Sequence, residues 1–595
     1  MRTVLGCGVK MKDGDVNFAS QLMNLTGIHP VIADIVSKMN GINLQNVDDF
    51  LTPKLRKLLP NPQVLKDMTL GVDHLVDAII NKKKIGILGD YDVDGVSSSA
   101  MLKIFLEMAG VEVENVIPNR FSDGYGPSIP LFQKIYERGI ETIITLDCGT
   151  VAFEPIEYAN SLGMKVVVVD HHISNIAKPD AVAVINPNQH GDSSGLNYLC
   201  AAGVTFLFCV GIYGKLRNNF LKHDINLLNL VPFAMLGSVC DMMKMVGLNR
   251  AFYRSGIEIL NQAVANFDKL NVAERSVFLG LKTLMQVGGI SKIRSTYDIG
   301  FILGPMINAG GRLESAMIGL DLLTCKDENL ALELANKLKE LNLERRDIQD
   351  EILQNALSQA EKMVKSNRAV IFEYSVQHEG VIGIVASKIK EIHHKPTIIG
   401  SLSYQNEIGV IKASCRSIDG VDIGAVVIKA LELGLILKGG GHVGAAGFSC
   451  LLSKYDELYA FFEQELGNSV LDAEKNRAIY VAASIIPRQV GKELCTALLQ
   501  LEPFGIGNEK PYFMIKNLYL VKYLVLKEKH YRVTFRDTTG GNSLWLDMMA
   551  FNALGEKIGK FISENINSTV SVICDISLSD YGNGVSIIIK DLILQ

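Results

Sequence analysis

The chain has 595 residues, of which 48% are hydrophobic and 21% are charged, and its formal net charge is −5. This length predicts several domains, and the negative balance excludes a protein that binds nucleic acid through its overall charge. The ten cysteines contain no Cys-x-x-Cys pair, which argues against a disulfide framework and a structural zinc site. There is neither an apolar stretch of transmembrane length nor a secretory h-region, so we expect a cytoplasmic protein without a membrane partner.

The first half of the chain combines a weakly patterned region with an α/β pattern. Residues 1–70 form an N-terminal leader region in which no element is strongly indicated. Residues 71–325 alternate short apolar runs with amphipathic helical stretches, which is the signature of a parallel sheet. Three of the runs, at 85–89, 142–146 and 165–169, have the length and apolar character of buried parallel strands.

Each of these three runs ends in acidic or imidazole side chains. The segments that follow them are Asp90-Tyr91-Asp92-Val93-Asp94-Gly95, Asp147-Cys148-Gly149 and Asp170-His171-His172. Because the carboxyl ends of parallel strands meet at one edge of a sheet, where open α/β sheets bind their ligands, we expect these side chains to converge. Asp241, which terminates the apolar segment Leu236–Cys240, is a fourth candidate.

The converging side chains predict a site for a hard divalent cation. Neighbouring carboxylates cannot all be ionised at low cost unless a cation lies between them. Mixed Asp and His ligands suit Mn²⁺ or Mg²⁺, and two such ions bridged by one carboxylate would suit phosphoester hydrolysis. Simpler interpretations stay open from the sequence: a capped turn at 90–95, a helix N-cap at Asp147 and a buried helix end at Asp241.

A long helix is predicted to follow the parallel-sheet domain. Residues 321–379 contain neither Gly nor Pro, and Leu, Ala, Glu and Lys dominate the stretch 328–366. We therefore expect one connector helix over 326–366, with two ordinary packed helices as the alternative.

Two further domains are predicted after the connector. Residues 367–466 suit a second, smaller α/β domain with a Gly-rich turn at Gly439-Gly440-Gly441-His442. The short strands of 467–595, with a hairpin turn at 537–541, suit a small antiparallel OB-like barrel. The predicted fold class is thus α/β, with a C-terminal β-barrel.

Taken in order along the chain, these motifs resemble those of the DHH phosphoesterase superfamily. Beyond the acidic and histidine motifs, Gly380–Ser387, Ser414–Ser417 and Gly440-Gly441-His442 resemble the DHH-associated domain. Pro503–Asn508 followed by Pro511 resembles the segment joining the OB domain in the RecJ family of single-strand-specific 5′→3′ DNA exonucleases. The resemblance covers residues 70–595, and the length and C-terminal domain select that family within the superfamily.

The resemblance implies a two-metal site. The residues that would ligate two ions, Mn²⁺ or Mg²⁺, are Asp92, Asp94, Asp147, His171 and Asp241. Asp147 would bridge the ions, and Asp90 and His172 would be either ligands or orienting residues. The residues that would bind phosphates of the strand are Asn308, Arg312, Ser414, Arg416, Gly440, Gly441 and His442. The family usually has Arg at the position of Met306, so one phosphate contact is expected to be absent.

The implied function is a 5′→3′ exonuclease on single-stranded DNA, active in DNA repair and recombination. We expect a monomer that works beside a single-strand-binding protein and a helicase. Two alternatives stay open. One is a DHH phosphodiesterase for short oligonucleotides or cyclic dinucleotides, although such relatives typically lack the OB-like domain. The other is an inactive single-strand-binding protein, which the intact acidic and histidine set argues against, because buried carboxylates are costly without a metal.

Overall fold

The structure is a computed structural model that describes residues 2–174, 176–218, 220–221, 225–405, 407–537, 544–579 and 584–594. The chain divides into two compact units. The smaller unit is built mainly from residues 340–479, and the larger unit combines residues 9–339 with residues 480–595. None of the helices in the described residues is long and apolar enough to cross a membrane.

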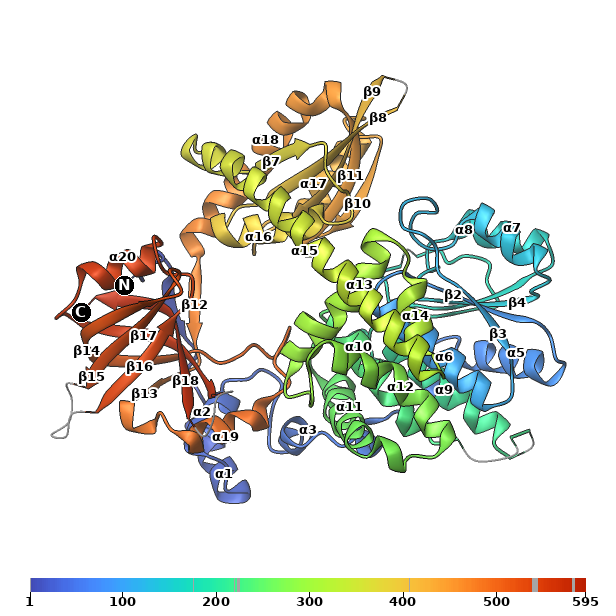
Figure 1. Cartoon of the computed structure of the whole chain (residues 1–595), viewed down its shortest axis with the longest axis horizontal. Helices are drawn as coiled ribbons and strands as arrows, with labels where there is room; N and C mark the ends of the chain where they lie inside the picture. Colours follow the sequence, from blue (N-terminus) through green and yellow to red (C-terminus); the bar gives the residue numbers. More distant parts are fainter. Residues whose placement is uncertain are drawn as a thin grey trace. The chain divides into compact units, whose positions relative to one another are not determined.

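A five-stranded parallel sheet forms the first domain of the larger unit (Figure 1). Its strands are β2 (Ile85–Gly89), β3 (Val113–Val116), β4 (Thr142–Leu146), β5 (Lys165–Val169) and β6 (Ala183–Ile185). They lie in the order β3-β2-β4-β5-β6, so the direction of winding reverses between β2 and β4. A doubly wound sheet opens a crevice at such a switch point, outside the carboxyl ends of its strands.

Helices cover both faces of this sheet. The large hydrophobic core lies between one face and α5 (Met68–Ile80), α6 (Val93–Met108) and α9 (Ala201–Leu216), and a smaller one lies under α7 (Ile129–Glu137) and α8 (Phe153–Ser161). The large core continues into a helical layer of α10 (Val231–Cys240), α11 (Gly247–Ala265), α12 (Val272–Val287), α13 (Gly304–Leu313) and α14 (Met317–Leu323). The central strands β2 and β4 are buried along their whole length because both of their faces are covered, whereas the edge strand β3 includes the polar residues Glu114 and Asn115.

The predicted connector is confirmed as one helix. Helix α15 runs without interruption over the 38 residues Glu328–Lys365, which corresponds to about 57 Å at 1.5 Å per residue. The alternative of two packed helices is therefore excluded. Uninterrupted helix formers and the absence of Gly and Pro explain its length.

The smaller unit contains a mixed sheet. Its strands are β7 (Ile371–Ser375), β8 (Thr397–Gln405), β9 (Ile408–Arg416), β10 (Lys438–His442) and β11 (Ala445–Leu451), in the order β10-β11-β9-β8-β7. Only β7 and β8 run parallel to each other. The helices of this unit after α15 are α16 (Ile382–His393), α17 (Ile423–Glu432) and α18 (Tyr455–Asn476).

The expected Gly-rich turn is wrong, because Lys438–His442 form edge strand β10. The reason is close packing on the neighbouring strand. A Cβ on Gly441 would lie 2.5 Å from the carbonyl oxygen of Ala445 and would collide with the backbone of Ala446, so a glycine is needed for the two strands to approach. The chain reverses one step later, between His442 and Ala445.

The C-terminal barrel is confirmed. Strands β14 (Phe513–Leu526), β15 (His530–Asp537), β16 (Trp545–Ala550), β18 (Val585–Leu594) and β17 (Thr569–Leu578) follow one another, and β14 closes the ring by pairing with β17. Strand β13 (Ala483–Ile485) adds to β14, and helices α19 (Lys492–Leu498) and α20 (Lys557–Glu564) complete the domain. The expected hairpin turn at 537–541 falls almost wholly on residues 538–543, outside the described residues.

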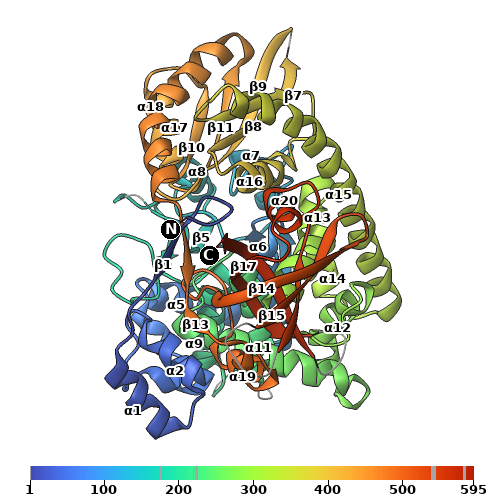
Figure 2. The ribbon, with the colours of Figure 1, turned by 90° about the vertical axis from the view of Figure 1, so that its left-hand side faces the viewer.

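The N-terminal region is more ordered than its weak pattern indicates. It forms α1 (Val16–Thr26), α2 (Pro30–Ser37), α3 (Val47–Leu51) and α4 (Leu55–Leu58), and β1 (Gly8–Met11) pairs with β12 (Ala478–Val481). Both views show α2 beside β13 and α19 (Figures 1 and 2). Buried residues of α1–α3, such as Ile32 and Phe50, share one hydrophobic core with the barrel.

Candidate metal centre

The loop between β2 and α6 presents the first aspartates at the switch point. Asp92 caps α6, since its Oδ1 accepts hydrogen bonds from the backbone N–H groups of Asp94 and Gly95 at 2.9 and 3.2 Å. Asp94 is buried, and its two oxygens accept from the N–H groups of Ala201 and Ala202 at 2.7 and 2.9 Å. These amides begin α9, so a helix N-terminus fixes the carboxylate of Asp94.

Asp90 is held in the same loop by a close backbone approach. A Cβ on Gly95 would lie 2.5 Å from the carbonyl oxygen of Asp90, so this tight turn requires glycine. The Asp90 side chain is buried, and its Oδ1 has no hydrogen-bond partner within the described part of the chain. Burial, together with the charge of Asp92, raises the pKa of Asp90 well above its usual value.

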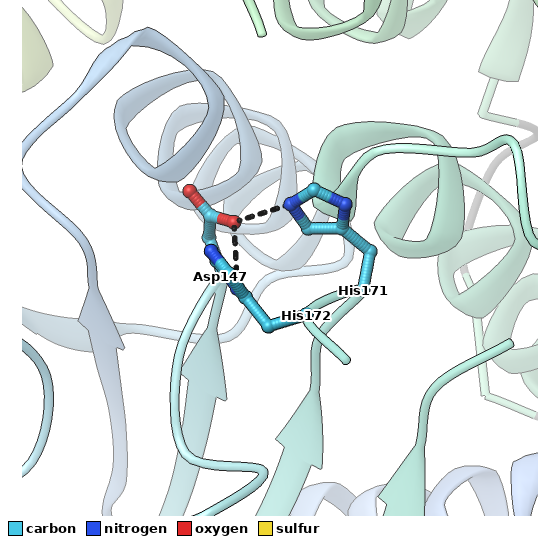
Figure 3. A group of neighbouring side chains, drawn as sticks. All are labelled: Asp147, His171 and His172. Carbon is cyan, nitrogen blue, oxygen red and sulfur yellow. Dashed lines mark ion pairs between the residues drawn. The ribbon is translucent and has the colours of Figure 1, made fainter. Parts of the chain in front are cut away.

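Asp147 stands directly at the end of β4 in a strained backbone conformation. Its φ of 63° lies in the left-handed region, which is uncommon for a residue other than glycine. Its Oδ1 has no hydrogen-bond partner among the residues described, although Nε2 of His171 lies 3.2 Å away and Nδ1 of His172 3.8 Å away (Figure 3). Burial and the charge of Asp94 raise the pKa of Asp147 well above its usual value.

His171 is the meeting point of the carboxylates. Its Nε2 lies 3.2 Å from Oδ1 of Asp147, 3.5 Å from Oδ2 of Asp241 and 3.8 Å from Oδ2 of Asp94. Asp241 reaches this point from the end of α10, and burial together with the charge of Asp94 raises the pKa of Asp241 to about 8. Burial also lowers the pKa of His171, which favours the neutral imidazole that binds metals.

Asp170 and His172 form a separate pair beside this cluster. Nδ1 of His172 lies 2.8 Å from Oδ1 of Asp170, whose carboxylate also accepts from the N–H groups of His171 and Thr150 at 2.7 and 3.1 Å. Although burial opposes it, this pairing lowers the pKa of Asp170 and raises the pKa of His172 to about 9. Asp170 thus orients the two histidines, a function that the sequence analysis did not assign to it.

Three more side chains support the site and were not found from the sequence. The hydroxyl of Tyr125 donates to the carbonyl of Asp147 at 3.1 Å. The amides of Asn186 and Asn188 donate to the carbonyls of His172 and His171 at 2.8 and 2.5 Å. Both asparagines closely follow β6, so the rule that located the other motifs, polar side chains after a parallel strand, would have found them.

The donor set fits two neighbouring divalent cations. Three groups of ligand atoms each lie within 4.8 Å of one another: Asp147 with His171 and His172, Asp94 with His171 and Asp241, and Asp90 with Asp92 and Asp147. Asp147 and His171 each belong to two groups. Oxygen and imidazole donors suit Mn²⁺ and Mg²⁺, and the unpartnered oxygens of Asp90 and Asp147 are the ones that a cation would neutralise.

The residues expected to bind phosphate lie in both units. Asn308 and Arg312 are on α13, which packs on the metal loop, since a Cβ on Gly311 would lie 2.7 Å from the carbonyl of Tyr91. Met306 of the same helix is 2% exposed and belongs to the large hydrophobic core. The side chain at position 306 therefore packs in the hydrophobic core of this chain.

In the smaller unit, the expected phosphate ligands lie on adjacent strands. Register pairs Arg416 of β9 with Ala445, and Ala445 with His442. Two residues further along β9, Ser414 pairs with Gly447, and Gly447 pairs with Gly440. Nη1 of Arg416 donates to Oγ of Ser414 at 3.0 Å, so strand pairing assembles the guanidinium, the hydroxyl and the glycine edge on one sheet.

Family models match three parts of the chain. Residues 84–234 match the N-terminal domain of the DHH family, residues 367–468 match the DHHA1 domain, and residues 481–591 match the RecJ OB domain.

Curated relatives cover most of the chain. The single-stranded-DNA-specific exonucleases RecJ of Dickeya dadantii and Escherichia coli are 31% and 30% identical, each over 84% of this chain and 86% of the relative. RecJ of Bacillus subtilis is 28% identical over 93% of this chain, but the match spans 66% of that longer protein.

Solved structures share the fold. RecJ of Thermus thermophilus in complex with Mn²⁺ matches with a TM-score of 0.77 and 22% identity, over 99% of this chain and 80% of that one. An exonuclease RecJ bound to manganese matches with a TM-score of 0.57 and 26% identity, over 70% of this chain and 99% of that one.

Proposed function

The chain belongs to the RecJ family of DHH phosphoesterases, and from this premise we propose that it is a metal-dependent exonuclease that degrades single-stranded DNA in the 5′→3′ direction. The observation that carries the proposal is the convergence of buried, uncompensated carboxylates with His171 at the switch point of the sheet. An OB domain that only binds strands would need no such cluster, so the pattern favours catalysis over passive binding.

The metal ligands are proposed residue by residue. Asp92, Asp94, Asp147, His171 and Asp241 would hold two ions, Asp147 would be the ligand that they share, and Asp90 would complete the group that contains Asp92. When bound, two Mn²⁺ or Mg²⁺ ions polarise the phosphodiester and the attacking water. The protein holds the ligands ready through the amides at the start of α9 and the carboxylate of Asp170.

We assign His172 to binding of the substrate. Its side chain is 48% exposed, and the pKa of about 9 that Asp170 gives it keeps the imidazole positively charged at neutral pH. A positively charged imidazole that is held by a buried carboxylate and exposed to solvent can bind an oxygen of the scissile phosphate. Asn308 and Arg312 of α13 would bind phosphates of single-stranded DNA, and within the smaller unit the residues that would do so are Ser414, Arg416, Gly440, Gly441 and His442.

The barrel provides a surface for bases further along the strand. Register places Tyr519, Arg536 and Trp545 in one row on β14, β15 and β16. The guanidinium of Arg536 lies 5.0 Å from the centre of the Tyr519 ring, and Trp545 is 54% exposed. Alternating aromatic and cationic side chains bind single strands without regard to sequence, through stacking and charge.

The cellular setting of the enzyme is part of the same proposal. We place the enzyme in the cytoplasm, in DNA repair and recombination. It acts there as a monomer whose substrate is opened by a helicase and coated by a single-strand-binding protein.

The test uses the full chain with Mn²⁺ and a 5′-phosphorylated single strand labelled at its 3′ end. A blunt duplex and a dinucleotide are run beside it. We expect shortened, still-labelled products from the single strand alone, and none with EDTA. Asp147→Asn is expected to be inactive, whereas Asp268→Asn, the same change at an exposed site, is expected to be fully active. Rapid hydrolysis of the dinucleotide alone would instead make the protein a small-substrate phosphodiesterase.

A further inference from the structure

The segment that follows Asp241 is docked on the entry to the barrel. Residues 501–508, here called the entry loop, lead into the C-terminal domain. The backbone N–H of Met245 donates to the carbonyl of Ile506 at 2.8 Å, and the hydroxyl of Thr296 donates to the carbonyl of Phe504 at 3.3 Å. Only three residues separate Met245 from Asp241, so the entry loop binds the chain shortly after the last proposed metal ligand.

Arg250 fastens the entry loop to the helical layer. Its side chain is 1% exposed and belongs to the first turn of α11. The guanidinium donates to the carbonyls of Phe50, Leu501 and Glu502, with shortest distances of 2.8, 3.2 and 3.0 Å. A fully desolvated guanidinium is costly unless its fork of donors is satisfied, so this geometry is strictly constrained. Burial accordingly lowers the pKa of Arg250.

The entry loop meets this guanidinium with an amide of its own. Asn508 is buried, and its Nδ2 donates to the carbonyls of Leu501 and Pro503 at 2.7 and 2.6 Å. Nη1 of Arg250 points at the same two carbonyls, at 3.3 and 3.5 Å. Asn508 from within the entry loop and Arg250 from α11 therefore both fix the conformation of this loop.

Asn249 connects the docked segment to the parts of the chain that support the metal ligands. It is completely buried, and its Nδ2 donates to the carbonyls of Tyr198 and Lys244 at 2.7 and 3.0 Å. Its Oδ1 lies 3.3 Å from the hydroxyl of Ser238, which also donates to the carbonyl of Ala234 at 2.8 Å. Ser238 lies one helical turn before Asp241 on α10. Tyr198 precedes the start of α9, whose amides hold Asp94. The side-chain amide of Asn249 therefore contacts both the segment before α9, whose amides bind Asp94, and helix α10, which leads to Asp241.

We infer that Asn249 and Arg250 are positioning residues through which the docked entry loop sets the geometry of the Asp94–His171–Asp241 ligand group. The C-terminal domain then has a second function besides binding DNA, because it tunes the affinity of one of the two metal ions. The inference rests on the proposed function, namely that this group holds a metal. Residues that orient the ligands without touching the metal typically change its affinity about 10–100-fold.

The experiment titrates Mn²⁺ into the metal-free full chain without DNA and measures free Mn²⁺ by electron paramagnetic resonance. The variants are Asn249→Ala, Arg250→Lys and Asn508→Ala. The matched control is Arg254→Lys on the same helix, whose guanidinium donates to the carbonyls of Leu499 and Gln500, outside the entry loop. Circular dichroism checks the fold of each protein.

We expect two Mn²⁺ ions to bind the unaltered chain and the Arg254→Lys control equally. In the three variants, one of the two ions should bind about tenfold or more weakly while the other is unchanged. Saturating Mn²⁺ should then restore kcat without a change in KM for the strand. Asn508→Ala is decisive if Asn249→Ala does not fold, since it loosens the entry loop without touching α10.

Two results would overturn the inference. Unchanged Mn²⁺ binding in folded Arg250→Lys and Asn508→Ala would show that the entry loop only anchors the barrel. An equal loss in the Arg254→Lys control would show a general loss of stability instead of an effect on ligand geometry. Failure of the unaltered chain to bind Mn²⁺ is a separate result, since it would overturn the proposed function itself.

Discussion

Replacing Asp147 with Asn should stabilise the metal-free protein while it abolishes activity. Asp147 is buried, its Oδ1 lacks a hydrogen-bond partner among the described residues, and its pKa is raised well above 3.8 by burial and nearby carboxylates. A group whose pKa is raised in the folded state makes folding less favourable as pH rises. Asparagine removes this charge, retains the shape of the side chain and tolerates the left-handed backbone at this position.

The magnitude follows from the cost of a buried polar group without a partner, about 1–3 kcal/mol. In a domain of about 150–250 residues, each kcal/mol of stability shifts the melting temperature by about 2–4 °C. The Asp147→Asn protein should therefore melt roughly 2–12 °C above the unaltered chain in EDTA at pH 8. The difference should shrink as pH falls, because protonation of the unaltered carboxyl removes the buried charge. Mn²⁺ at 100 times its Kd should stabilise the unaltered chain by about 2.7 kcal/mol, but should stabilise the variant much less.

Thermal melts at pH 5 and 8, with EDTA or with Mn²⁺, check this expectation. Asp170→Asn should change the stability in the opposite direction, because His172 and the surrounding N–H groups lower the pKa of Asp170. That carboxylate stabilises the fold above its unfolded pKa, so its replacement should cost about 3–5 kcal/mol at pH 8. An Asp147→Asn protein that melts below the unaltered chain in EDTA, or keeps the full response to Mn²⁺, would refute the reasoning.

Three further changes test other parts of the molecule. His172→Gln should remove the alkaline limb of the pH–rate profile near pH 9, because the charge that Asp170 maintains on the unaltered imidazole is lost as pH rises through that value; an unaltered limb would assign it to another group. Trp545→Ala should weaken binding of long single strands by about 1–3 kcal/mol, measured by fluorescence anisotropy, with Mn²⁺ binding to the DNA-free protein as the unaffected control. Met306→Arg, which restores the usual family residue, should lower the melting temperature and not the KM, because the side chain lies in the hydrophobic core; a lower KM in a stable protein would contradict this.

Sequence reasoning located the strand ends well because their chemistry is local. The apolar runs before Asp90, Asp147 and Asp170 determine where each parallel strand stops, and parallel pairing then brings the three ends together. The same logic did not separate the functions of neighbours in one motif. Asp170 differs from Asp147 in its partners, among them the N–H group of Thr150 and the ring of His172, and these contacts depend on the tertiary fold.

Where long-range packing decides the structure, local patterns are less informative. A run of glycines permits either a turn or a strand, and for Gly441 the approach of Ala446 from the next strand decides the outcome. Arg250 has an ordinary sequence context on an amphipathic helix, yet its partners include Phe50 and Leu501, 200 and 251 residues away along the chain. Such partners cannot be read from local periodicity.

The packing of the N-terminal helices against the barrel has a consequence for synthesis of the protein. The ammonium of Lys38, at the end of α2, bonds to the carbonyl of Ala482, 444 residues later in the chain. At about 5–20 residues per second, a ribosome needs roughly 20–90 s to produce that partner. During this time the apolar side of α2, including Ile32 and Val36, has no core to join. These helices therefore leave the ribosome long before they can fold onto the barrel, and they are a segment that we expect a chaperone to protect.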